Sequence, residues 1–187
     1  MIFNVLKKIG LLGVLAAGVS GQASAEPMAG APLACPTEAA LNRVITSKTL
    51  PMEVYQRLAH CVEQGTPQSH RAGVRLLAYG AAQTFYDSYR VPDVTAHQAG
   101  AYLRRVVLDN PLAQDFKEDA FAILKDDQKR AELCRLTIKM PIPNYDPAYM
   151  VNHGMAAMSG AGSGVNKVAK PKDSWARAVA AYLSCPS

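Results

Sequence analysis

The fold is decided by residues 66–90, which read TPQSHRAGVRLLAYGAAQTFYDSYR. Thr66 followed by Pro67 places a capping side chain before a proline at the first helical position, which is a helix start signal. At 100° per residue, one face of the helix that follows collects mainly apolar or small side chains. These are Val74, Leu77, Ala78, Ala81, Phe85 and Ser88. The stretch therefore predicts a long amphipathic helix over 67–90.

The same start signal recurs at Asn110–Pro111 and Asp146–Pro147. No segment has the sustained two-residue alternation that predicts a strand. We therefore expect an all-α fold, a single-domain antiparallel helical bundle held by two disulfides. Its seven helices, or eight if the chain breaks at Asp126–Asp127, should cover about 37–46, 51–64, 67–90, 95–108, 111–125, 127–139, 147–159 and 174–185.

The helix expected over 95–108 carries small and apolar residues along one side. These are Ala96, Ala99, Gly100, Leu103, Val106 and Val107. Small residues permit a close approach between helices. Because only VPDV, residues 91–94, separates this helix from the one before it, we expect the two to be antiparallel neighbours.

Residues 1–25 have the features of a secretory signal peptide. Lys7 and Lys8 precede an apolar run that is too short to span a bilayer, and the small residues that end at Ala25 fit a cleavage site. We expect cleavage there, export to the periplasm or the medium, and a mature domain over 26–187 without a stable membrane anchor.

Four cysteines are an even number, which fits two disulfides in an exported chain. Cys35 precedes the first expected helix and Cys61 lies near the end of the second, so an antiparallel pair would bring the two together. Cys134 and Cys185 would then pair by exclusion. The chain has no Cys-x-x-Cys, which argues against the common redox and zinc sites.

Charge is mild and scattered along the chain. Without Lys7 and Lys8, 18 of the 20 basic residues remain against 15 acidic ones, a net charge of +3. No long run of like charges occurs, which argues against a nucleic-acid partner.

Residues 149–164, YMVNHGMAAMSGAGSG, combine methionines, a histidine and glycines. On one helix, a single arc would hold Met150, Val151, Gly154, Met155 and Met158. Such an arc favours core packing, because methionine fills irregular gaps. Only Met150 and His153 have the spacing that a Cu(I) site needs, so we expect no metal and no cofactor.

The glycine run GAGSG, residues 160–164, lacks the preceding strand and the Gly-Lys-Ser/Thr ending of a phosphate-binding loop. We expect instead a flexible surface loop over about 160–173. Such a loop would enter an acidic cleft of an enzyme that the protein blocks. It carries Lys167, Lys170 and Lys172.

No catalytic set is recognisable in the chain. The four histidines have no metal-ligand spacing, and no Gly-x-Ser-x-Gly elbow occurs. Two carboxylate pairs, Glu53 with Glu63 and Glu118 with Asp119, would suit glycan cleavage only at separations of about 5 to 10 Å. Acidic residues on helices are usually solvated, so we expect no enzymatic activity.

Arg75, Tyr79, Tyr86 and Arg90 form one stripe along the helix over 67–90. Tyrosine and arginine are enriched where binding energy concentrates, so this stripe and the loop lysines are the candidate partner-binding residues. The alternative is that the tyrosines pack against a neighbouring helix while the arginines reach water.

A small, exported, disulfide-linked helical domain without catalytic residues is suited to binding another protein. We therefore expect stoichiometric protein–protein interaction. The favoured hypothesis is an immunity or inhibitor protein that neutralises a toxin or hydrolase in the periplasm. This hypothesis is an analogy with proteins of the same general kind and rests on no identifying motif. The alternatives are an envelope enzyme that acts on cell-wall glycan and a periplasmic metal carrier that uses the Met/His segment.

Overall fold

The computed structural model describes residues 33–160 and 164–185. The expected signal peptide and its cleavage site therefore lie outside the described residues. Within the described ranges the chain is all-α, and no strand occurs there. None of the helices in these ranges is both long enough and apolar enough to cross a bilayer.

Nine α-helices and three 3-10 helices follow one another in the described ranges. The longer helices are α2 (Pro51–Gln64), α3 (Pro67–Ser88), α4 (Gln98–Leu108), α5 (Gln114–Lys125), α6 (Asp127–Ile138) and α9 (Pro171–Leu183). Three are single turns: α1 (Leu41–Val44), α7 (Ala148–Val151) and α8 (Met155–Met158). The 3-10 helices are η1 (Glu38–Ala40), η2 (Val94–His97) and η3 (Pro111–Ala113).

The start signal at Thr66 acts as expected. Its side chain and that of Ser69 each bond the other's backbone N–H, which makes a capping box for α3. Asn110 also caps, but it begins the 3-10 turn η3 before α5. Asp126 accepts hydrogen bonds from two backbone N–H groups of α6, so the expected break between α5 and α6 is present.

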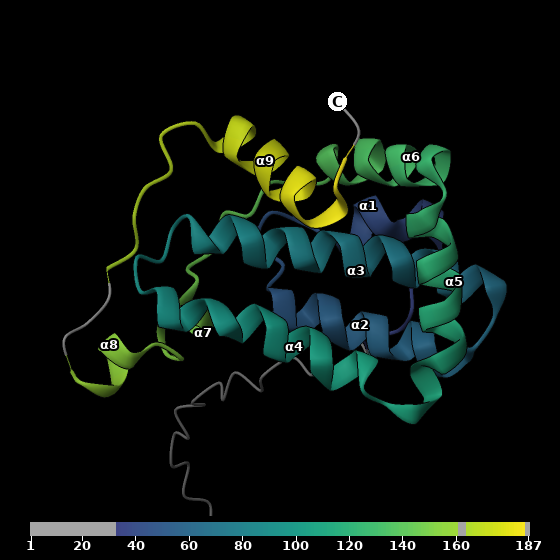
Figure 1. Cartoon of the computed structure of the whole chain (residues 1–187), viewed down its shortest axis with the longest axis horizontal. Helices are drawn as coiled ribbons and strands as arrows, with labels where there is room; N and C mark the ends of the chain where they lie inside the picture. Colours follow the sequence, from purple (N-terminus) through teal and green to yellow (C-terminus); the bar gives the residue numbers. More distant parts are fainter. Residues whose placement is uncertain (1–32, 161–163, 186–187) are drawn as a thin grey trace, which may run out of the picture. The chain divides into compact units, whose positions relative to one another are not determined.

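α3 is the central helix of the described fold (Figure 1). It contacts α2 and α4 on one side and α6 and α9 on the other, while α5 lies across its N-terminal end. Consequently, α3 is buried around most of its circumference, including Leu76 and Tyr79. The single inward face expected from the sequence was too narrow, and it wrongly included Phe85, which is exposed, and Ser88, which is half-buried.

The small residues of α4 allow the close helix approach that their pattern predicts. A β-carbon at Gly100 would lie 2.5 Å from the β-carbon of Thr84 on α3. Val106, in contrast, was expected inside and is 61% exposed. Adjacent positions on a helix point 100° apart, and the buried Val107 takes the inward position.

Both disulfides of the structure join the cysteines expected from the order of the helices. Cys35–Cys61 ties the segment before η1 to α2, with a Cα–Cα distance of 4.7 Å. Cys134–Cys185 ties α6 to the residues that follow α9, with a Cα–Cα distance of 5.9 Å. The fold is therefore cross-linked on both sides of α3.

We expect Cys134→Ser/Cys185→Ser to lower the free energy of unfolding by about 4 kcal/mol and Cys35→Ser/Cys61→Ser by about 3.5 kcal/mol. In the chain-entropy model the loss grows with the closed loop, and the bonded cysteines are 51 and 26 residues apart. Denaturant unfolding of both double variants measures the losses. A clearly larger loss for the Cys35–Cys61 pair would contradict the loop-length argument.

The helix expected over 147–159 is broken into α7 and α8 at Gly154, whose backbone is extended (φ −84°, ψ 155°). A β-carbon at Gly154 would lie 2.2 Å from Asp93 Oδ2. Asp93 accepts a hydrogen bond from Ala156 N at 2.9 Å, and the Thr95 hydroxyl accepts one from Met155 N at 2.8 Å. The hydrogen bonds from Thr95 and Ala156 lower the pKa of Asp93.

This break changes where the methionines lie. Met150 is fully buried, but Met155 is 59% exposed and Met158 is 78% exposed. The expectation that all three point inward is therefore wrong for the last two. The contacts of Asp93 and Thr95 turn α8 out of line with α7, so a single helical arc does not exist there.

The last helix begins at Pro171 and not at 174. Proline fits the first helical position, and Ser174 N donates to Lys170 O at 3.0 Å, which closes the first turn. Lys172 therefore lies on α9. The expected loop is correspondingly shorter at its C-terminal end, and its residues 161–163 lie outside the described residues.

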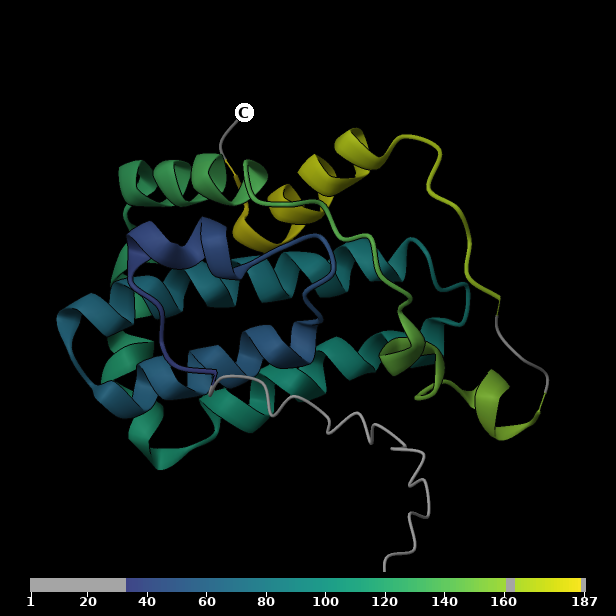
Figure 2. The same ribbon diagram turned by 180° about the vertical axis from the view of Figure 1, so that it is seen from behind.

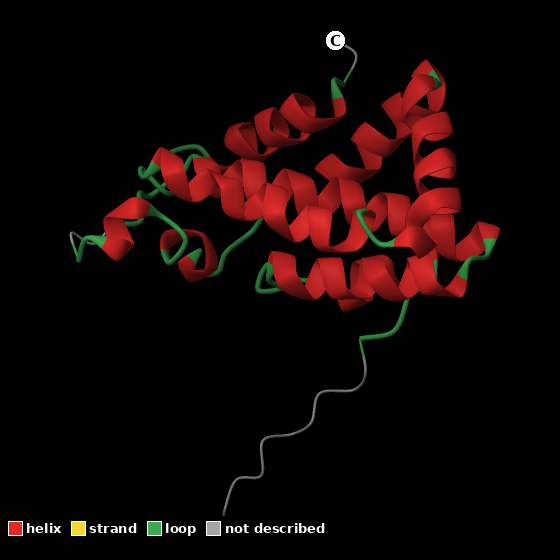
Figure 3. Cartoon of the chain, turned by 60° about the horizontal axis from the view of Figure 1, so that its bottom comes forward, coloured by secondary structure: helices red, strands yellow, loops and turns green. Residues whose placement is uncertain are grey.

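The segment from 139 to 147 has no helix and runs from the end of α6 across α3 to α7 (Figure 2). Figure 3, which is coloured by secondary structure, shows that loops such as this one connect the helices. The described ranges contain no strand. The contacts of residues 139–147 with α3 position the candidate site.

Candidate functional site

Tyr79 and Tyr86 lie in the core and not on the surface. Their rings pack edge-on against Trp175 of α9, with ring-centre distances of 5.6 and 6.1 Å. The Tyr79 hydroxyl donates to Pro141 O at 2.8 Å, and burial raises its pKa. The expectation that these two tyrosines contact a partner is therefore corrected, because α9 already covers them.

Arg75 and Arg90 do not share one surface either. Arg75 lies on α3 and Arg90 lies two residues beyond its end, and fifteen helical positions would correspond to about 22 Å along a helix axis. Arg75 Nη1 donates to Glu38 O at 3.2 Å, near the N-terminal part of the chain. Arg90 follows the other end of α3, where it contacts the segment from 139 to 147.

Arg90 belongs to a buried polar network around Asp87, which is fully buried. Asp87 accepts hydrogen bonds from Arg90 Nη1 at 2.9 Å, from the Tyr145 hydroxyl at 2.8 Å and from the Tyr149 hydroxyl at 2.9 Å. Arg90 also donates to Tyr145 O and lies over the Tyr145 ring. The network therefore holds residues 145–149 against the end of α3.

Burial raises the pKa of Asp87 above the usual carboxyl range, although the donors Tyr145, Arg90 and Tyr149 oppose the shift. Each of these donors compensates part of the cost of removing a carboxylate from water. Asp87 Oδ2 accepts from both tyrosines and Oδ1 accepts from Arg90, so removing Arg90 would leave Oδ1 without its side-chain donor.

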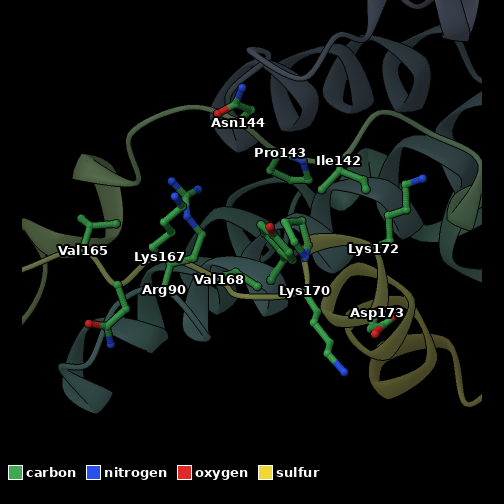
Figure 4. A pocket seen from close by; sticks show the side chains of 13 residues that line it. Arg90, Ile142, Pro143, Asn144, Val165, Lys167, Val168, Lys170, Lys172 and Asp173 are labelled. Carbon is green, nitrogen blue, oxygen red and sulfur yellow. The ribbon is translucent and has the colours of Figure 1, made fainter.

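A cleft of about 850 Å³ opens beside this network (Figure 4). Its walls come from the end of α3, from residues 142–144, and from the segment that leads into α9. Asn166 N donates to Arg90 O at 2.7 Å, which ties that last segment to the end of α3. The walls are thus joined through Arg90.

Cationic and apolar side chains line this cleft together. The cations are Arg90, Lys167, Lys170 and Lys172, and the apolar side chains include Ile142, Pro143, Val165 and Val168. Figure 4 shows Lys170 and Lys172 extending in different directions at the edge of the cleft. Asp173 is the one acidic side chain among the described residues that line it.

The structure therefore brings together two groups of residues that the sequence suggested separately. The cleft is lined by Arg90 from the stripe and by the three lysines. Arg75 and Tyr79 do not line it, and Tyr86 is buried. Tyr86 contributes only to the cleft wall.

Sequence reasoning missed Asp87, Tyr145 and Tyr149. Two signals were available: Asp87 is the only carboxylate in the helix over 67–90, and the two tyrosines are four residues apart. Four-residue spacing can place two side chains on the same side of the chain. Only the fold shows that this side meets Asp87.

The two carboxylate pairs suggested for glycan cleavage lie on α2 and on α5. Glu53 and Glu63 are ten residues apart on α2, about 15 Å along the helix, beyond the range that such catalysis needs. Glu118 accepts a hydrogen bond from Gln114 at 2.9 Å, and Asp119 is paired with His70 at 2.6 Å. Both side chains are exposed on α5.

A smaller cleft of about 250 Å³ contains Ser88 and His97. The Ser88 hydroxyl donates to Phe85 O at 2.7 Å, and His97 Nε2 donates to Val91 O at 2.8 Å. A serine nucleophile needs its hydroxyl bonded to a general base. These two side chains bond to backbone carbonyls, so they do not form that arrangement.

Among the described residues, no three or more His, Cys, Asp or Glu side chains are grouped as a metal site. Met150 is fully buried whereas His153 is exposed, with its Nδ1 bonded to Tyr149 O. The one pair with the spacing of a Cu(I) site is therefore split between core and solvent. Comparison of the chain with protein-family models, curated proteins and solved structures gave no match.

Proposed function

We propose that this chain is an exported antiparallel helical bundle that binds another protein stoichiometrically and catalyses nothing itself. The partner is a toxin or hydrolase of the cell envelope, which the protein neutralises as an immunity or inhibitor protein. The observation that carries this proposal is the cationic cleft between α3, residues 142–144 and the segment before α9. It combines charge with apolar surface, as protein-binding sites do.

The construction of the cleft supports a binding role. Its walls are joined by the buried Asp87 network and by the Asn166–Arg90 hydrogen bond. A site that is formed before its partner arrives loses less conformational freedom on binding. Such preorganisation suits a protein that acts by occupying its partner.

Two further observations support the compartment and the absence of catalysis. Disulfides persist in oxidising compartments, and the described residues contain two of them. Glu53 and Glu63 are ten residues apart on α2, and the Ser88 and His97 side chains bond to backbone carbonyls. Together with the signal-like N-terminus, these observations favour a binding protein outside the cytoplasm.

The proposal is tested by purifying the tagged protein from the envelope of its source cells under native conditions. Mass spectrometry should identify one co-purifying protein, and light scattering of the purified pair should give a fixed small-integer ratio. The partner's activity should fall in proportion to the protein added. Turnover of peptidoglycan or lipid by the protein alone, lost when one carboxylate is changed, would refute the proposal.

A further inference from the structure

We propose that the cleft receives a protruding segment of the partner in which acidic residues alternate with apolar ones. This inference rests on the proposed function and specifies how the partner is recognised. It also reverses the geometry expected from the sequence, in which a lysine loop would enter an acidic cleft of the partner. In the structure the lysines line a hollow of this protein, so the complementary element is convex.

Charge is the first observation that carries the inference. Arg90 is already paired with Asp87. Lys167, Lys170 and Lys172 form no ion pair with any described residue, and the lining includes a single aspartate. The rim therefore has an uncompensated positive charge, which attracts carboxylates and disfavours cationic partners.

The apolar part of the lining is the second observation, and it favours a peptide over a simple anion. Ile142, Pro143, Val165 and Val168 line the cleft together with the cations, and Val165 is 45% exposed. An inorganic anion or a phosphate backbone would cover this apolar surface without gaining hydrophobic contact. Apolar side chains of a peptide, on either side of its carboxylates, would instead cover the apolar surface of the cleft and remove that surface from water, which is favourable.

The fixed walls are the third observation. Asn166 N is bonded to Arg90 O, and Arg90 is bonded to Asp87 and to Tyr145 O. The lysine-bearing segment before α9 is therefore tied to the core at the point where it lines the cleft. Its lysines form a rim around an inserted segment and do not project as a free arm.

The test uses a short fluorescein-labelled peptide of alternating Asp and Leu residues and measures its anisotropy with the full mature protein. Lys167→Glu/Lys170→Glu should weaken binding about tenfold or more. Added salt should weaken binding of the peptide to the wild type, because salt screens the attraction between the lysines and the peptide carboxylates. The matched control is Lys117→Glu/Lys125→Glu, which makes the same charge change on α5 and should alter binding less than about twofold.

The apolar requirement has its own pair of variants. Val165→Ser in the cleft should weaken binding of the same peptide several-fold, whereas Val106→Ser, at an exposed position on α4, should leave it unchanged. A peptide in which Asn replaces every Asp should bind at least about tenfold more weakly. Circular dichroism of each variant should match the wild type, which separates loss of binding from loss of fold.

Four results of the experiments with purified protein and these probes would overturn the inference. These are absence of peptide binding, binding that ignores the Lys167→Glu/Lys170→Glu change, tighter binding of tripolyphosphate than of the peptide, and tighter binding to phosphatidylglycerol vesicles. The proposed function fails separately. If a co-purified partner binds wild type and the charge-reversed variant equally, this inference is wrong but stoichiometric binding stands.

Discussion

Tyr79→Ala is expected to lower the free energy of unfolding by about 3 to 5 kcal/mol, the usual cost of emptying a buried aromatic site. Tyr79 is fully buried, packs against Trp175 and donates a hydrogen bond to Pro141 O. The substitution removes the packing between α3 and α9 and leaves the Pro141 carbonyl without this donor. Denaturant unfolding followed by far-UV circular dichroism measures the change.

Two variants show which part of the interaction matters. Tyr79→Phe keeps the ring and removes the hydrogen bond, so it should cost only about 1 kcal/mol. Tyr102→Ala removes a tyrosine that is 63% exposed on α4, and its effect should stay within about 0.5 kcal/mol. A loss for Tyr79→Ala as small as that for Tyr102→Ala would mean that Tyr79 is a surface residue, as the stripe hypothesis required.

Asp87→Ala is expected to cost about 3 to 5 kcal/mol at neutral pH, because breaking a buried ion pair leaves the other charge uncompensated. Arg90, Tyr145 and Tyr149 would all lose the acceptor that they share. A matched control is Asp127→Ala. It breaks an Asp–Arg pair with the same three-residue spacing, but with its carboxylate 86% exposed, and should cost about 1 kcal/mol or less.

The pH dependence of the Asp87 contribution has a definite sign. Burial raises the pKa of Asp87 in the folded state above its unfolded value, so the folded protein binds the proton more tightly. The contribution of this carboxyl to stability is therefore fully present below the ordinary carboxyl pKa and declines as pH rises through the raised value. Asp87→Asn does not titrate, so the stability of wild type relative to this variant should fall from acid to neutral pH.

Unfolding curves of wild type and Asp87→Asn from acid to neutral pH would measure this difference. A relative stability of wild type that grows with pH would show that the pKa of Asp87 is lowered and not raised. Asp87→Ala and Asp87→Asn should also weaken peptide binding to the cleft, because the Asp87 network holds Arg90 and residues 145–149 in place.

The sequence by itself determined the all-α class, the starts of α2, α3 and α6, and the cysteine pairs, whereas α4, α5, α7 and α9 begin one to three residues away from the expected positions. Helix starts are local, since a capping side chain and a following proline act within one turn, as at Thr66 and Pro67. The cysteine pairs followed from the positions of Cys35 and Cys61 at neighbouring helix ends. No distant contact was needed for these conclusions.

Only the tertiary structure decided which side chains are inside and which residues meet at the cleft. A helical face predicts burial when one side is covered, but α3 is covered on several sides, so Tyr79 and Tyr86 are core residues. The break at Gly154 depends on Asp93, far earlier in the chain. The cleft likewise depends on Asp87 reaching Tyr145 and Tyr149, because burial and hydrogen bonding between distant segments arise only when the helices are packed.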